Sequence, residues 1–202
     1  MNIDKVSIVE NLLKGTEEPD RQFLIQFSEC FGVNSSWLLH GEHEPYLSCK
    51  LIDSPAHVMA EIAEKKPEQI IFVRSNSEYA ECAIVFKYGN WRYKILNGSW
   101  HVSKHIGGSG TAQLVALYKL IKLLNKTEFN CRGYNVDEQH FQKLIDGQCF
   151  PGALLSGRSR NGDWYYALLD LHHKNTTAIH YAEWYGQPFV DAQQVIRKYL
   201  SS

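Results

Sequence analysis

Three runs of apolar residues, spaced three or four positions apart, open the chain, and a glycine follows each run. Apolar side chains at this spacing lie on one face of an α-helix, and glycine favours the left-handed backbone that ends one. The sequence therefore predicts three short helices, with the apolar residues Val6, Val9, Leu12 and Leu13; Phe23, Leu24, Phe27 and Phe31; and Trp37, Leu38 and Leu39. The predicted helix stops are Gly15, Gly32 and Gly41.

Beyond Pro67 the pattern changes to strands rich in β-branched and aromatic residues. Residues 47–66 before it form a predicted connector with a short helix over 57–65. Gly89-Asn90 and Asn97-Gly98 are two-residue hairpin signals. The sequence predicts an antiparallel meander of up to four strands, at residues 70–74, 79–88, 91–96 and 99–103.

The remaining chain combines predicted helices and strands. Helices are predicted over 111–125 and 136–146, and a last helix carries apolar residues from Ala192 to Leu200. Further strands are predicted at 154–158, 164–171 and 176–184. This order favours an α+β domain with an antiparallel sheet over a parallel βαβ sheet. The expected organisation is a short all-α segment at 1–46, the connector at 47–66, and an α+β domain at 67–202.

Composition indicates a globular protein, because 44% of the 202 residues are hydrophobic and the net charge is −1. No apolar run reaches the roughly 18 residues of a membrane span, and the first residues lack the pattern of a secretory signal. The five cysteines form no C-x-x-C pair, which argues against a disulfide framework or a structural zinc site. We therefore expect a cytoplasmic protein without a metal or a cofactor.

Charge is divided unevenly along the chain. Residues 1–46 contain three basic and eight acidic residues, a charge of 3 − 8 = −5, and the remainder carries +4. Proteins that bind DNA usually show a basic surface, because lysine and arginine neutralise phosphates. The acidic first segment is therefore unusual for a DNA reader.

The stretch from about residue 5 to 46 resembles the C-terminal half of the XRE family, the lambda-repressor-like helix-turn-helix regulators of bacteria and phages. The resemblance rests on Lys14-Gly15 followed by Pro19, on Gly32-Val33 after an apolar helix, and on the closing segment 37–42, Trp-Leu-Leu-His-Gly-Glu. It implies that residues 4–13 correspond to the recognition helix. Base contacts would then come from Asn2, Lys5 and Asn11.

Family members carry two further helices before the recognition helix, whereas Met1 falls where that helix starts. We therefore expect open apolar faces, which usually meet a partner. The expected association surface consists of Leu12, Phe23, Phe27 and Trp37. Three interpretations stay open: the segment packs on the larger domain, it associates with itself or a partner, or it binds DNA.

A glycine-rich loop precedes the predicted helix 111–125. Its residues are Gly107, Gly108, Ser109, Gly110 and Thr111. Such a loop is either an anion- or ligand-binding turn at a helix start or a simple tight turn. It also partly resembles a nucleophile elbow, with Ser109 as nucleophile, Asp170 as the acid, and His173 or His180 as the base. Thr111 in place of the last glycine and the antiparallel sheet argue against this hydrolase interpretation.

Aromatic residues alternate with basic ones in the second domain. The set comprises Trp91, Tyr93, Trp100, Trp164, Tyr165, Tyr166, Trp184 and Tyr185, with Arg92, Lys94, Arg158 and Arg160. They form either a stacking surface for nucleic acid or an aromatic ligand, or a core with solvated basic residues outside.

These features lead to three functional hypotheses. The first is an XRE-related transcriptional regulator with a C-terminal ligand-binding or oligomerisation domain. The second is an antirepressor-like interaction protein that binds no DNA and uses the half-motif to engage itself or a complete regulator. The third, more distant, is a small hydrolase with Ser109 as nucleophile. We expect a homo-oligomer, a dimer in the simplest case.

Overall fold

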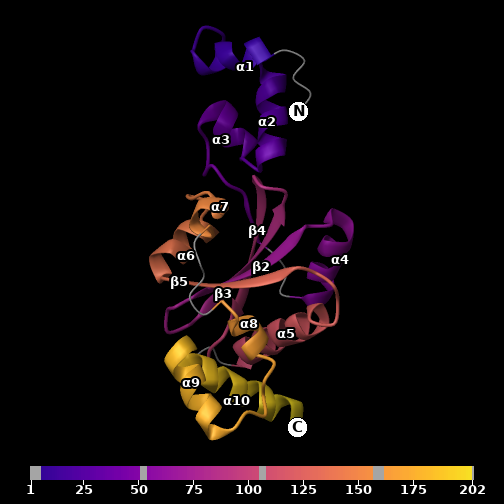
Figure 1. Ribbon diagram of the computed structural model, residues 1–202, viewed down its shortest axis with the longest axis vertical. Coiled ribbons are helices and arrows are strands. Elements are labelled where there is room, and N and C mark those ends of the chain that lie inside the picture. The colour runs from indigo at the N-terminus through magenta and orange to yellow at the C-terminus, as the bar shows by residue number, and fades with distance from the viewer. Residues whose placement is uncertain (1–5, 51–53, 105–107, 157–161, 202) are drawn as a thin grey trace.

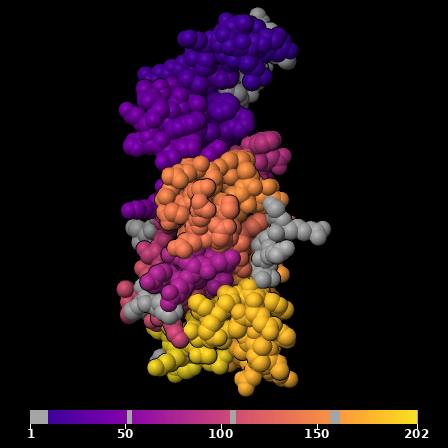
Figure 2. Space-filling model, turned by 90° about the vertical axis from the view of Figure 1, so that its left-hand side faces the viewer, coloured from indigo at the N-terminus to yellow at the C-terminus, as the bar shows by residue number. Residues whose placement is uncertain are grey.

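The computed structural model describes residues 6–50, 54–104, 108–156 and 162–201. It has the predicted α+β fold, with a mixed five-stranded sheet among the described residues. A helical lobe lies at one end of the sheet and a helical pair at the other, so the molecule is elongated (Figures 1 and 2).

The first lobe contains the three predicted helices, α1 (Val6–Leu13), α2 (Arg21–Phe31) and α3 (Ser35–His40). We call residues 6–46 the N-terminal module. The Asp20 carboxylate accepts the Phe23 backbone N–H at 2.7 Å, which caps α2. The Asn34 side chain caps α3 in the same way. The predicted stops at Gly32 and Gly41 are confirmed as C-caps.

The sheet runs in the order β1-β4-β3-β2-β5. Its strands are β1 (Ser48–Lys50), β2 (Gln69–Ser75), β3 (Glu81–Tyr88), β4 (Arg92–His101) and β5 (Cys131–Val136). The antiparallel meander β2-β3-β4 is confirmed, but β1 pairs in parallel with β4 and β5 in parallel with β2. The sheet is therefore mixed, because two short strands that the sequence did not reveal add to its edges.

The predicted turn at Asn97-Gly98 is wrong. The two strands expected around it form the single strand β4, which pairs with β3 along its length. The register steps from Cys82 opposite Trp100 to Ala83 opposite Asn97, so β4 contains a bulge. Glycine inside a strand is found at bulges as well as at turns. Here the residues before and after Gly98 both pair with β3, so the glycine lies at a bulge.

Two layers of helices cover the sheet. Helices α4 (Pro55–Lys65) and α5 (Gly108–Leu124) cover one face, and α6 (Glu138–Ile145) and α7 (Pro151–Leu154) cover the other (Figure 1). The larger apolar cluster lies under α4 and α5 and the smaller one under α6 and α7. Helix α6 begins two residues later than predicted because Asn135 and Val136 still pair in β5.

The strands predicted at 154–158, 164–171 and 176–184 are wrong. The first stretch contains only the end of α7 and then a turn, and its residues 157 and 158 lie outside the described residues. The second begins with the one-turn helix α8 (Trp164–Ala167) and continues without a strand, the third lies in α9 (Asn175–Tyr185), and the predicted last helix is α10 (Gln187–Ser201). Rings four residues apart stack along α9, with the His180 and Trp184 centroids 5.7 Å apart. In a strand they would lie about 13 Å apart. Aromatic content favours a strand only where a sheet neighbour is present.

A narrow seam joins the N-terminal module to the sheet. Within the module Val33 bridges Tyr46, whose backbone N–H donates to the Gly147 carbonyl at 3.0 Å. The end of α2 contacts β4, where Gly32 lies against Tyr93. The Tyr46 ring packs on Phe150, with centroids 5.7 Å apart. The module is thus attached through the turn between α6 and α7, together with the end of α2.

Candidate functional site

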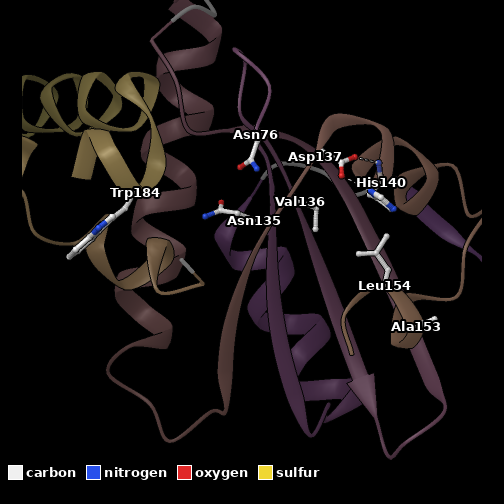
Figure 3. A pocket seen from close by; sticks show the side chains of 8 residues that line it. All are labelled: Asn76, Asn135, Val136, Asp137, His140, Ala153, Leu154 and Trp184. Atoms are coloured by element: carbon white, nitrogen blue, oxygen red, sulfur yellow. Dashed lines mark hydrogen bonds and ion pairs between the residues drawn. The ribbon is translucent and has the colours of Figure 1, made fainter. Parts of the chain in front are cut away.

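A cavity of about 640 Å³ lies at the carboxyl ends of β2 and β5 (Figure 3). These strands are parallel neighbours, so their ends meet at the same edge of the sheet. The lining residues are Asn76, Asn135, Val136, Asp137, His140, Ala153, Leu154 and Trp184. The carboxyl edge of parallel strands is where open α/β sheets bind ligands, and the volume suits a small molecule.

An aspartate–histidine pair forms one wall of this cavity (Figure 3). Asp137 is the N-cap of α6 and accepts the His140 backbone N–H at 2.9 Å. Its other oxygen lies 2.6 Å from the His140 ring Nδ1. The backbone and ring hydrogen bonds from His140 lower the pKa of Asp137, so the carboxylate is ionised at neutral pH. The pair holds a proton on Nδ1 and leaves Nε2 as an acceptor in the neutral ring.

A buried arginine stands behind the opposite wall. Arg74, the partner of Asn135 in the sheet register, is 2% exposed. Its guanidinium donates to the Asn135 side-chain oxygen at 3.3 Å and to the Tyr185 carbonyl at 2.7 Å, and it lies over the Phe189 ring. No carboxylate among the described residues pairs with it. Burial accordingly lowers the pKa of Arg74.

Arg74 does not line the cavity but positions part of its rim. Tyr185 is the last residue of α9, so its carbonyl lies at the negative end of that helix dipole. The hydrogen bond from Arg74 holds this helix end against the sheet and so fixes Trp184, the preceding residue, at the rim. The result is a hollow with amide, imidazole and carboxylate groups on one side and an indole on the other. It suits a small ligand with hydrogen-bonding edges.

Sequence reasoning missed most of this site. Trp184 was among the singled-out aromatic residues, but Asn76, Asp137 and His140 were not predicted as a group. Asparagine is a common helix-capping residue, so Asn135 by itself suggests the start of a helix. Only its pairing in strand β5 places it against Arg74. The available signal was weak: polar residues at the carboxyl ends of two strands.

The glycine-rich loop does not gain support as an anion site. Gly107 lies outside the described residues, and Gly108, Ser109, Gly110 and Thr111 form the first turn of α5. The Gly110 carbonyl accepts a hydrogen bond from the His101 ring at 3.0 Å. Lys104, which precedes the loop, pairs with Asp191 at 2.6 Å.

The residues expected around Ser109 bond to other groups. The Tyr181 hydroxyl donates to the Asp170 carboxylate at 3.0 Å. The His173 ring bonds to Gln193, and the His180 ring bonds to Glu183. Ser109 itself is exposed. Nothing in these contacts assembles a catalytic triad.

The residues expected to contact DNA are described only in part. Asn2 and Lys5 lie outside the described residues. The Asn11 side chain donates to Glu17 at 3.4 Å, and its carbonyl accepts from Thr16. Lys14 lies 3.9 Å from Glu10. The polar groups at the end of α1 therefore hold the turn toward α2.

The expected association residues lie at the surface of the N-terminal module. Leu12, Phe23 and Phe27 are half-buried, and Trp37 is 40% exposed. Phe23, Phe27 and Phe31 form a row along α2, with successive ring centroids 6.4 and 4.5 Å apart. Of the side chains that the structure describes in this module, no apolar one is fully buried.

The aromatic residues of the second domain divide between core and surface. Trp100 and Trp164 are buried and Tyr185 nearly so, whereas Trp91, Tyr166 and Trp184 are more than half exposed. Arg158 and Arg160 lie outside the described residues. The predicted set is therefore not one continuous stacking surface.

Cysteines and metal ligands give no further site in the described chain. Cys82 is buried in β3, and burial raises the pKa of its thiol. Burial also raises the pKa of Cys131 to about 11 and that of Cys149. The described residues contain no group of three metal-ligating side chains. None of their helices has the length and apolar character to cross a membrane.

Comparison with known proteins leaves the geometry as the basis for inference. No family model, no curated protein and no solved structure matches this chain.

Proposed function

We propose that this chain is an XRE-related regulatory protein whose N-terminal module acts through protein association. The observation that carries the proposal is the phenylalanine row of α2. Its three rings lie along one helix. Among the described side chains of the module, no apolar one is fully buried, so the rings do not cover a core. Apolar surface of this kind on a polar background is typical of a protein–protein contact.

The family part of the proposal rests on the sequence resemblance and on supporting local structure. Helices α2 and α3 lie where the resemblance places helices, and their caps are the aspartate, asparagine and glycines of the quoted stretch. In this proposal the sheet domain carries the regulatory input, a small ligand in the cavity at the ends of β2 and β5.

Association is favoured over base reading by charge and by local contacts. Residues 1–46 carry −5, and Asn11 and Lys14 face the carboxylates of Glu17 and Glu10. An antirepressor-like partner of a complete regulator is the alternative within the same class. The Ser109 hydrolase gains no support from the contacts of Asp170, His173 and His180.

Sedimentation velocity tests the association. The wild-type protein is expected to form dimers at tens of micromolar, and Phe27→Ser is expected to shift it to monomer because it interrupts the ring row. Gln26→Ser is the matched control, since Gln26 is the exposed neighbour on the same helix. A monomeric wild type, or equal dimerisation in both variants, contradicts self-association through α2.

A DNA titration separates association from base reading. Fluorescence anisotropy with promoter-derived and random duplexes is expected to show weak binding without sequence preference. The log–log salt slope should be about 2 or less, since each phosphate contact adds about 0.9. Tight, sequence-selective binding that Asn11→Ala abolishes would assign base reading to this segment instead.

A further inference from the structure

A second groove, of about 430 Å³, lies at the opposite end of the β2–β5 pair from the cavity of Figure 3. We call it the basic aromatic groove. It is lined mainly by Gln69, Lys87, Trp91, Tyr93, Arg132 and Phe150. It opens on the sheet face that carries α6 and α7, and α7 separates it from the first cavity, since Ala153 lines both.

The sheet register places two cations in this groove. Lys87 of β3 pairs with Gln69 of the central strand β2, and Arg132 of β5 pairs with Ile71 of β2. The Cα atoms of Lys87 and Arg132 are therefore two strand spacings apart across the sheet and two residues apart along it, which is about 12 Å. No lining residue is acidic, and neither cation has an ion-pair partner in the part of the chain that the structure describes. Glu68 lies beside Gly89 at the nearby hairpin and does not line the groove.

Aromatic rings form the remainder of the groove. Trp91, at the tip of the β3–β4 hairpin, is 61% exposed. Tyr93 and Phe150 meet edge to face with centroids 5.4 Å apart, which fixes both rings in the wall. The exposed indole of Trp91, next to the packed rings of Tyr93 and Phe150, offers a flat surface on which another ring can stack.

The cations of the groove are not those that the sequence pattern singled out. The Arg92 guanidinium lies over the Tyr88 ring, and Lys94 pairs with Glu61 of α4 at 2.7 Å. Both contacts lie on the opposite face of β4 from Tyr93, because successive strand residues alternate. The neighbouring strands β3 and β5 supply Lys87 and Arg132 in their place.

We propose that the basic aromatic groove binds a nucleotide unit, with its base stacked on Trp91 and its phosphate at Lys87 and Arg132. The amides of Gln69 and Asn90, both lining residues, can meet the polar edge of the base. A free mononucleotide and one unit of a single strand present the same chemistry. A duplex does not, because its base faces are stacked inside the helix. This site is separate from the association surface and from the cavity of Figure 3.

Anisotropy of a fluorescein-labelled twelve-residue oligothymidylate tests the proposal with the full-length protein. Binding is expected to weaken with salt with a log–log slope of about 0.7, the contribution of one phosphate neutralised in a single strand. If free nucleotide is the ligand, AMP displaces the oligonucleotide. If a strand is the ligand, affinity rises with oligonucleotide length and AMP does not compete. Either result supports a nucleotide unit.

Matched variants locate the binding. Trp91→Ala should weaken binding at least about fivefold, the lower end of the effect of losing one stacked base. Arg132→Gln should weaken binding and flatten its salt dependence, because it removes a cation from the phosphate. Tyr166→Ala removes a ring of α8 that lines neither the groove nor the cavity of Figure 3 and is 61% exposed, like Trp91, and Lys126→Gln removes an exposed cation just after the end of α5. These controls should leave binding unchanged. The proposal is overturned if the wild type binds neither probe at low salt, if duplex binds as well as single strand, or if Trp91→Ala behaves like Tyr166→Ala.

Discussion

The N-terminal module and the sheet domain use the same apolar residue types in different ways. Phe72 and Phe86 of the sheet have no exposed surface, because helices pack on both faces. Phe23 and Phe27 of α2 stay half-buried, because the described module has one layer of short helices without a second layer over the ring row. The comparison teaches that an amphipathic stripe specifies a helix and its face, whereas a core requires a second element to cover that face.

The largest expected difference between the two regions is the loss of stability on removing a ring. Phe72→Ala should lower the free energy of unfolding by about 3–5 kcal/mol, since it leaves a cavity beneath Trp164 and Tyr165. Phe27→Ala should lower it by less than about 1 kcal/mol, because the ring is partly in water and few contacts are lost. Urea unfolding followed by tryptophan fluorescence measures both. Equal losses would mean that α2 belongs to the cooperative core.

The seam gives the next largest effect. Gly147 has a φ of +76°, and a Cβ there would lie 2.0 Å from the Tyr46 carbonyl oxygen. Gly147→Ala should therefore lose the seam and add about 1–2 kcal/mol of left-handed backbone strain. Gly41→Ala is the control, since Gly41 has a φ of +68° and no heavy atom within 4 Å of the added Cβ.

Limited proteolysis between residues 41 and 55 measures the seam. Cleavage should accelerate strongly in Gly147→Ala and little in Gly41→Ala, which retains the hydrogen bond between Tyr46 and Gly147. If both variants are cleaved at the same rate, backbone strain alone explains the effect and the seam does not restrain the module.

Helix caps provide a smaller contrast of about 1 kcal/mol. Asp20→Ala removes the cap of α2, and Asp137→Ala removes the cap of α6. Helix α6 buries Phe141 and Leu144, so its amides should stay protected from hydrogen exchange. Helix α2 has no such anchor and should fray. The asparagine variants should preserve both caps, and fraying of α6 to the same extent would contradict the contrast.

The smallest expected effect is a pH dependence confined to the sheet domain, because Tyr181 is partly exposed and water screens its interactions. Burial first, and then the hydrogen bond to Asp170, raises the pKa of Tyr181 to about 12. A tyrosine in the unfolded chain has a pKa of about 10. The stability that Tyr181 contributes is therefore complete below pH 10 and is lost as pH rises toward 12.

The Tyr181→Phe variant measures that contribution. The difference in unfolding free energy between wild type and variant should shrink as pH rises from 10 to 12. Residues 1–45 contain no tyrosine, so absorbance at 295 nm follows titration in the rest of the chain alone. A difference that is constant across this pH range would mean that Tyr181 titrates at its ordinary pKa.

Local signals in the sequence were sufficient for the helices that carry their own caps and periodicity. Asp20, Gly32 and Gly41 act within a few residues of their position, so α2 and α3 follow from the sequence. The meander β2-β3-β4 also follows, since one antiparallel neighbour succeeds another along the chain. These elements were predictable because their contacts are short in sequence.

Only the tertiary structure decided the elements and sites that depend on distant partners. Strand β5 exists through its pairing with β2, about 60 residues earlier, and that pairing brings Asn135 beside Arg74 and Arg132 beside Ile71. The aromatic stretch of α9 is a helix because it packs against α10 and because Arg74 holds its last carbonyl. The sequence by itself determined which segments are amphipathic and where they end. Which faces are covered, and which side chains meet in the cavity and the groove, depends on the register of parallel strands, and no local pattern encodes that register.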